Sequence, residues 1–184
     1  GAGLESVGFQ FHLYDLKAHF AGKKFPPSQL LETYEKFGKL GLPLFISEIT
    51  IPANLEPGAA GEAIQAETLA YLYRLWFSVP RMAGIVYWNF PDGTQFRSNN
   101  PAQATAGLVD TCMCEKPAYQ AIYQLIHREW TTRLAAKSDA MGNAQFRGFY
   151  GKYTVQVTAG GRSEDFSIDL TKDGPESYKI TLKP

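Results

Sequence analysis

The chain has 184 residues, of which 45% are hydrophobic and 20% are charged, as is ordinary for a globular protein. Its 18 basic and 18 acidic residues cancel to a formal net charge of zero and form no basic stripe, so nucleic acid is not an expected partner. No apolar run reaches the roughly 18 residues of a membrane-spanning helix, so we expect no membrane partner either.

The first third of the chain predicts a strand, a helix and a second strand. Residues 7–13 form a short apolar run that is typical of a buried strand. Residues 30–40 place apolar side chains three and four positions apart, which predicts a helix, and Gly41 follows its end. Residues 42–51 are almost continuously apolar, which indicates a parallel strand covered on both faces.

The middle of the chain continues this alternation. A long helix is predicted over residues 62–78, a strand over 83–90, an irregular loop over 91–114 and a last helix over 117–134. Strands that alternate with helices predict an α/β fold with a parallel sheet. Three strands do not close a barrel, because a (β/α)₈ barrel needs about 250 residues and this part has about 135.

The last part of the chain has a different pattern. Apolar and polar residues alternate over 146–157, 166–170 and 178–182, and glycine-containing turns separate these runs. The pattern predicts a small all-β module with about four strands. Because about 45 residues would be marginally stable alone, we expect this module to pack on the preceding part.

Polar side chains lie at or just past the carboxyl ends of the three predicted strands, where parallel α/β folds form their sites. They are Gln10 and His12, then Glu48, then Trp88 and Asp92. A carboxylate inside an apolar strand is costly unless it is paired or functional, so Glu48 is predicted to be catalytic. The alternatives are a structural Glu48 bonded to backbone or arginine, and a His12 that is only a satisfied core histidine.

Several short motifs occur in a fixed order along residues 4 to 130. They are Gly8–His12, Leu40–Pro43, Ile46–Ile49, Gln65–Ala66, Trp88–Asp92, Gly107–Asp110 and Lys116–Tyr119. Together they resemble glycoside hydrolase family 10, the retaining endo-β-1,4-xylanases. No single motif decides the resemblance, but their order and spacing are specific.

The resemblance implies a TIM-barrel fold whose sixth to eighth strands are present here. Residues 1–136 are then the C-terminal part of a glycoside hydrolase barrel, and residues 137–184 are a small β-sandwich-like module. The first five strands would precede Gly1, so we expect an N-terminal barrel half, in the same or a separate chain, as a partner. Without it the open sheet edges are expected to make the fragment associate or aggregate.

The resemblance also implies roles for the polar residues. Glu48 stands where the family has its nucleophile, and His12 where a histidine orients that nucleophile. Gln10 and Trp88 stand beside the sugar of the first negative subsite, and Asp92 belongs to the same substrate-binding motif. No cofactor and no metal are implied.

Two departures from the family leave the sugar preference open. Thr50 replaces an aspartate that bonds the histidine, and a neutral hydroxyl there is expected to favour a neutral imidazole. Phe96 replaces a second tryptophan of the substrate-binding set and keeps a stacking surface.

The family's acid/base glutamate lies on the fourth strand, before this chain. One catalytic contribution of about 10²–10⁴-fold is therefore missing, and the isolated chain is expected to be inactive.

The predicted function is a retaining hydrolase of internal β-1,4-xylosidic bonds in xylan-type polysaccharide, in which this chain supplies the nucleophile half. The alternatives are a non-catalytic carbohydrate-binding remnant and a related retaining barrel glycosidase with another sugar specificity. The family implies a secreted or periplasmic protein. The β tail is interpreted as a stabilising cap or as a carbohydrate-binding module that uses Phe149 or Tyr150.

Overall fold

The computed structural model describes residues 3–93 and 104–182. The chain divides into two compact units, Gly1–Ile126 and His127–Pro184, and each is described by itself. The boundary expected from the sequence, after residue 136, falls inside the second unit.

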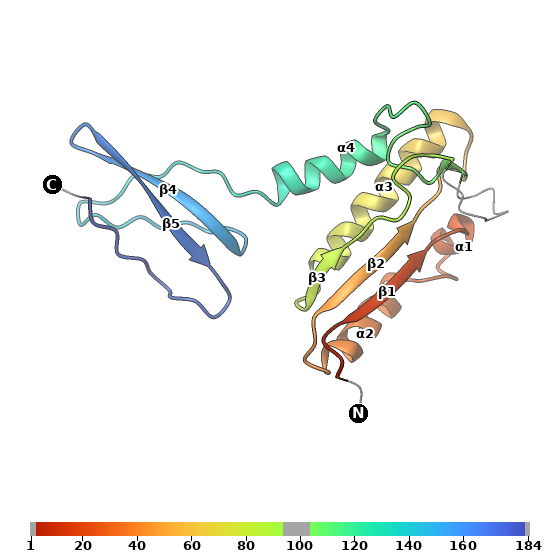
Figure 1. The fold of residues 1–184 in the computed structure, drawn as a ribbon, viewed down its shortest axis with the longest axis horizontal. Coiled ribbons are helices and arrows are strands. Elements are labelled where there is room, and N and C mark those ends of the chain that lie inside the picture. The colour runs from red at the N-terminus through yellow and green to blue at the C-terminus, as the bar shows by residue number, and fades with distance from the viewer. Residues whose placement is uncertain (1–2, 94–103, 183–184) are drawn as a thin grey trace. The chain divides into compact units, whose positions relative to one another are not determined.

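The first unit contains a sheet of three parallel strands in the order β1 (Val7–His12), β2 (Leu44–Thr50) and β3 (Met82–Ile85) (Figure 1). The predicted parallel α/β arrangement is confirmed. Strand β3 is shorter than predicted, but the chain still follows β2 past its end. The Trp88 amide donates to the Ile49 carbonyl at 3.0 Å, so Trp88 is held at the same edge of the sheet as the end of β2.

Helices connect and follow these strands. They are α1 (Leu16–Phe20), α2 (Pro27–Gly38), α3 (Gly58–Phe77) and α4 (Pro117–Gln124), which continues as a π-helical turn over Leu125–Glu129. The last helix is therefore shorter than predicted, and α1 was not predicted because five residues are too few to show a period. Within the described ranges, none of the helices is long and apolar enough to cross a membrane.

The core of this unit lies on one face of the sheet. Phe9 and Phe11 point to that face, where their rings lie 5.2 Å from Tyr34 of α2 and 5.1 Å from Trp76 of α3. The two helices also meet, because the Trp76 indole donates to the Tyr34 hydroxyl at 2.9 Å. Strand side chains alternate, so Gln10 and its neighbours at even positions point to the opposite, uncovered face.

The second unit contains one antiparallel pair, β4 (Gly151–Ala159) and β5 (Arg162–Leu170). Gly160 and Gly161 join them with φ of 56° and 77°, a left-handed conformation that suits the tight turn of a hairpin. The prediction of about four strands was wrong for the described residues, since 178–182 do not pair as a strand. The second sheet that a β-sandwich requires is likewise not found between residues 127 and 182.

Candidate active site

The pairing of β1 with β2 determines which polar residues meet. The register shifts between Phe9 and Gln10, which places Gln10 opposite Glu48 and His12 opposite Thr50. Parallel strands with aligned ends bring their carboxyl-terminal side chains to one edge of the sheet. Residues 38 positions apart in the sequence thus become neighbours there.

Glu48 is contacted at both carboxylate oxygens. The Gln10 amide donates to its Oε1 at 2.8 Å, and His12 Nε2 lies 3.3 Å from its Oε2. The Glu48 side chain is 21% exposed, so one side of the carboxylate remains open. An oriented and accessible carboxylate is what a nucleophile in glycoside hydrolysis requires.

His12 is held on its far side by a buried polar chain that includes a residue the sequence analysis did not single out. Its Nδ1 lies 2.9 Å from the Thr50 hydroxyl, which donates to Asn89 Oδ1 at 2.7 Å. Tyr14 stacks on the imidazole with ring centroids 5.6 Å apart. In the sequence, Asn89 is an amide within the otherwise apolar run 83–90 and lies inside the motif Trp88–Asp92, but neither feature reveals its partner.

Trp88 is 56% exposed at the same edge of the sheet. An exposed indole offers a flat apolar surface of the kind on which a pyranose ring stacks. The role of Trp88 beside the sugar of the first negative subsite remains a prediction. The predicted binding residue Phe96 lies outside the described residues.

Asp92 has protein partners in the structure. Its carboxylate forms an ion pair with Lys116, Nζ to Oδ1 3.0 Å, and accepts a hydrogen bond from the Gly107 amide at 2.7 Å. Lys116 is only 3% exposed and also donates to the Thr105 carbonyl at 3.0 Å. These contacts make Asp92 an anchor for the segment that leads to α4, and its predicted role in binding substrate remains a prediction.

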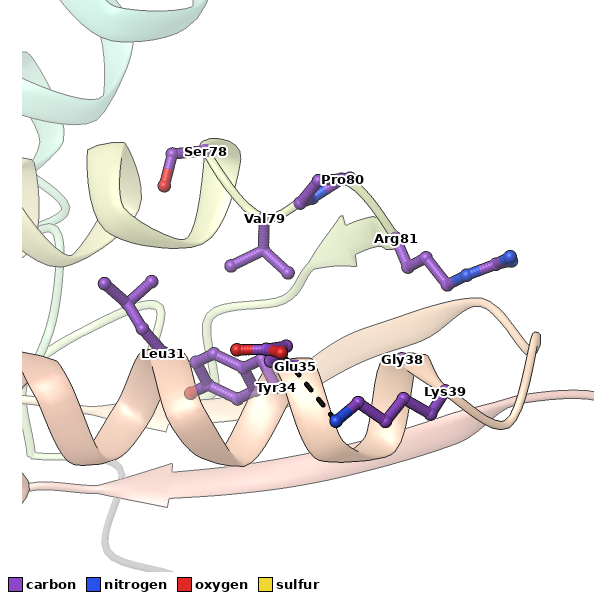
Figure 2. A pocket seen from close by; sticks show the side chains of 9 residues that line it. All are labelled: Leu31, Tyr34, Glu35, Gly38, Lys39, Ser78, Val79, Pro80 and Arg81. Carbon is purple, nitrogen blue, oxygen red and sulfur yellow. Dashed lines mark ion pairs between the residues drawn. The ribbon is translucent and has the colours of Figure 1, made fainter.

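A groove of about 410 Å³ lies at the amino-terminal end of the strands, where α2 ends and β3 begins. Figure 2 shows Val79 facing α2, and an ion pair between Glu35 and Lys39 at 3.8 Å. The groove is far along the strands from Glu48, so it does not belong to the carboxylate site. Among the described residues, no group of three or more histidine, cysteine, aspartate or glutamate side chains could hold a metal ion.

Comparison with known proteins decides the family. The model of glycosyl hydrolase family 10 matches residues 1–125, which is most of the chain. The chain belongs to glycosyl hydrolase family 10. The resemblance seen in the sequence motifs is confirmed.

Relatives of this family 10 chain include enzymes and a regulator. The xylanase 10B from Thermotoga petrophila RKU-1, solved with xylobiose, shares 25% identity at a TM-score of 0.53, over 68% of this chain and 37% of that one. Anti-sigma-I factor RsgI6 of Acetivibrio thermocellus is 30% identical over 170 residues, 92% of this chain and 21% of that protein. Endo-1,4-beta-xylanase 2 of Arabidopsis thaliana is 23% identical, over 85% of this chain and 13% of that protein. The chain thus spans about a fifth or less of the length of these two sequence relatives.

Proposed function

We propose that this family 10 chain carries the nucleophile of a retaining glycoside hydrolase, and that the nucleophile is Glu48. The observation that supports this most directly is the contact of both Glu48 oxygens with Gln10 and His12 at the carboxyl edge of the sheet. Such contacts reduce the rotational freedom of the side chain before substrate arrives, which lowers the entropic part of the activation barrier.

In the proposed reaction, a Glu48 oxygen attacks the anomeric carbon and forms a covalent glycosyl-enzyme. The bond from the anomeric carbon to the leaving oxygen breaks, and an acid on another part of the barrel protonates that oxygen. Water then attacks the same carbon and releases Glu48, while the deprotonated acid takes the water's proton. The second carboxyl group of this scheme would lie about 5 Å from Glu48.

The proposed substrate is a xylan-type polysaccharide cut at internal β-1,4-xylosidic bonds. This follows from the xylanases among the relatives, one of which was solved with xylobiose. Trp88 is the proposed stacking surface for the sugar next to the scissile bond. Because xylan is a large extracellular polymer, we also propose a secreted or periplasmic location.

We further propose that the sheet is completed by an N-terminal barrel half, in the same or another chain. Strands β1 and β3 are the edges of the sheet, and β2 is paired on both sides. Unpaired parallel edges with an uncovered face favour further strand pairing. In this arrangement the three strands would be the sixth to eighth of a (β/α)₈ barrel.

The proposal is tested by mechanism-based labelling of Glu48. The chain is incubated with a 2-fluoro-xylobioside that has a dinitrophenolate leaving group, which departs without protonation, and the peptides are then analysed by mass spectrometry. We expect a fluoroxylobiosyl group on the peptide that contains Glu48 and no sustained turnover of an ordinary aryl xylobioside by the chain alone.

Matched variants control this experiment. Glu48→Gln is expected to abolish the label, whereas Glu56→Gln, which changes an exposed carboxylate after the same strand, is expected to retain it. Labelling at another carboxylate would overturn the assignment. A 2-fluoro-cellobioside that labels Glu48 faster than the xylobioside would instead indicate a related glycosidase with another sugar specificity.

A second candidate function is non-catalytic recognition of polysaccharide. It is favoured by the match to an anti-sigma-I factor over 92% of this chain, a relative whose name denotes regulation. The chain would then bind xylo-oligosaccharide at the Trp88 edge without forming a covalent intermediate. Calorimetric binding of xylohexaose together with an unlabelled Glu48 would support this candidate over the first.

A further inference from the structure

Asn89 has no role in the proposed reaction, yet it is 2% exposed and lies directly after Trp88 at the carboxyl edge of the sheet. Its Oδ1 accepts a hydrogen bond from the Thr50 hydroxyl at 2.7 Å, and Thr50 itself is fully buried. The same hydroxyl oxygen lies 2.9 Å from His12 Nδ1. Two buried polar side chains, Asn89 and Thr50, therefore lead to the imidazole that faces Glu48.

The number of protons available to the hydrogen bonds between Asn89, Thr50 and His12 fixes their directions. A threonine hydroxyl carries one proton, and Thr50 donates it to Asn89. Towards His12 the hydroxyl oxygen can then only accept, so Nδ1 must carry a proton. His12 Nε2, at 3.3 Å from Glu48 Oε2, makes an attractive contact only when a further proton lies between the nitrogen and the oxygen.

We infer that Asn89 is a positioning residue that acts through Thr50 to keep a proton on Nδ1 of His12, and so determines how His12 meets Glu48. The inference rests on the proposed role of Glu48 as nucleophile. The proton between the two groups is carried either by an imidazolium or by a carboxylic acid.

The other groups around the imidazole agree with this assignment. Gln10 approaches from the same strand and is bonded to Glu48 Oε1, while the Tyr14 ring lies against the imidazole face at an interplanar angle of 2°. Neither contact offers an alternative acceptor to Nδ1. The Thr50 hydroxyl, itself bonded to Asn89, contacts Nδ1 on that side of the ring.

Removal of the Asn89 acceptor has a specific consequence. The Thr50 hydroxyl would lose its partner and could turn to donate to His12 Nδ1, which would then be bare. Nε2 would carry the proton of a neutral imidazole and donate it to Glu48. The variant would therefore lose the proton on Nδ1 without losing the contact between His12 and Glu48.

The test measures the protonation of His12 by NMR and does not depend on turnover. Long-range proton–nitrogen correlation spectra of the ¹⁵N-labelled chain distinguish a protonated ring nitrogen from a bare one. His19→Gln and His127→Gln identify the signals of the other two histidines in the sequence. We expect a protonated Nδ1 on His12 in the unsubstituted chain and a bare Nδ1 in Asn89→Leu.

Three variants separate this role from a general loss of structure. Asn89→Asp retains an oxygen acceptor and Thr50→Ser retains the hydroxyl, so both should keep Nδ1 protonated. Thr68→Val, which removes another buried threonine hydroxyl bonded only within α3, should also leave His12 unchanged. The dispersion of the amide spectrum reports whether each variant is folded, and Asn89→Ala replaces Asn89→Leu if the leucine does not fit.

The possible outcomes are distinct. A bare Nδ1 in the unsubstituted chain, or a protonated Nδ1 in a folded Asn89→Leu or Asn89→Ala variant, overturns the role of Asn89. A Glu48 that is not labelled by the fluorinated xylobioside overturns the proposed function and leaves the tautomer result unaffected.

Discussion

The two units place their aromatic residues differently. In Gly1–Ile126, Trp76 is fully buried and Tyr34 is 3% exposed, because two helices cover one face of a three-stranded sheet. In His127–Pro184, Tyr150 remains 68% exposed, and Ile168 is the buried hydrophobic residue of the described part. A hairpin without an opposing layer cannot bury its alternating apolar side chains. The comparison shows that an apolar pattern becomes a core only where a second layer of structure covers it.

The largest change in stability is expected when the buried ion pair of the first unit is removed. Lys116→Met leaves the Asp92 carboxylate without its cation and should lower the free energy of unfolding by about 3–5 kcal/mol. Urea denaturation measures the change. Lys36→Met, which removes an exposed pair with Glu32, is the control and should change stability little. A loss at Lys116 as small as that at Lys36 would contradict the anchoring role.

A pair of isoleucine deletions compares the two units directly. Ile46 is fully buried in β2, so Ile46→Ala should cost about 2–5 kcal/mol. Ile168 is 8% exposed in a two-stranded sheet, so Ile168→Ala should cost less than about 1.5 kcal/mol. Native-state amide hydrogen exchange reports each unit separately. Equal losses would show that the hairpin has a core of its own.

The burial of Tyr34 makes the stability of the first unit depend on pH in the alkaline range. Burial raises the pKa of Tyr34 to about 12, against a smaller opposing effect of its bond to Trp76. Between pH 10 and pH 12 the unfolded chain loses this proton and the folded unit keeps it, so stability is complete below pH 10 and falls as the pH rises towards 12. Tyr34→Phe should flatten this decline in urea midpoints measured at several pH values. The remaining slope comes from Tyr73 and Tyr87, whose pKa values are also raised by burial.

The smallest effect is expected at the surface of the second unit. Tyr150→Ala removes an exposed ring and should change stability by no more than about 0.5 kcal/mol. Pull-down of the chain on insoluble xylan should be unchanged as well, if the hairpin unit is a cap. Weaker retention of a variant with unchanged amide exchange would instead identify Tyr150 as a carbohydrate platform.

Local apolar patterns predicted the secondary structure of much of the first unit correctly, but they predicted a strand in the second unit that does not form. The spacing of apolar residues gave α2 and α3 within a few residues, because each presents one face to the sheet. The run 178–182 alternates as a strand should, yet it is not one, because no neighbouring strand pairs with it. Alternation reports a half-buried environment and cannot by itself supply the pairing partner.

The sequence alone determined that Glu48 is a carboxylate at the end of an apolar strand and that its motifs belong to family 10. Only the tertiary structure decided that Asn89 reaches His12 through Thr50, and that Asp92 is held by Lys116. Thr50 and Asn89 lie 39 positions apart in the sequence, and Asp92 and Lys116 lie 24 positions apart. The strand register brings the first pair together, and the return of the chain before α4 brings the second pair together. Burial is encoded locally by residue type, whereas the choice among distant polar partners depends on geometry that only the folded sheet provides.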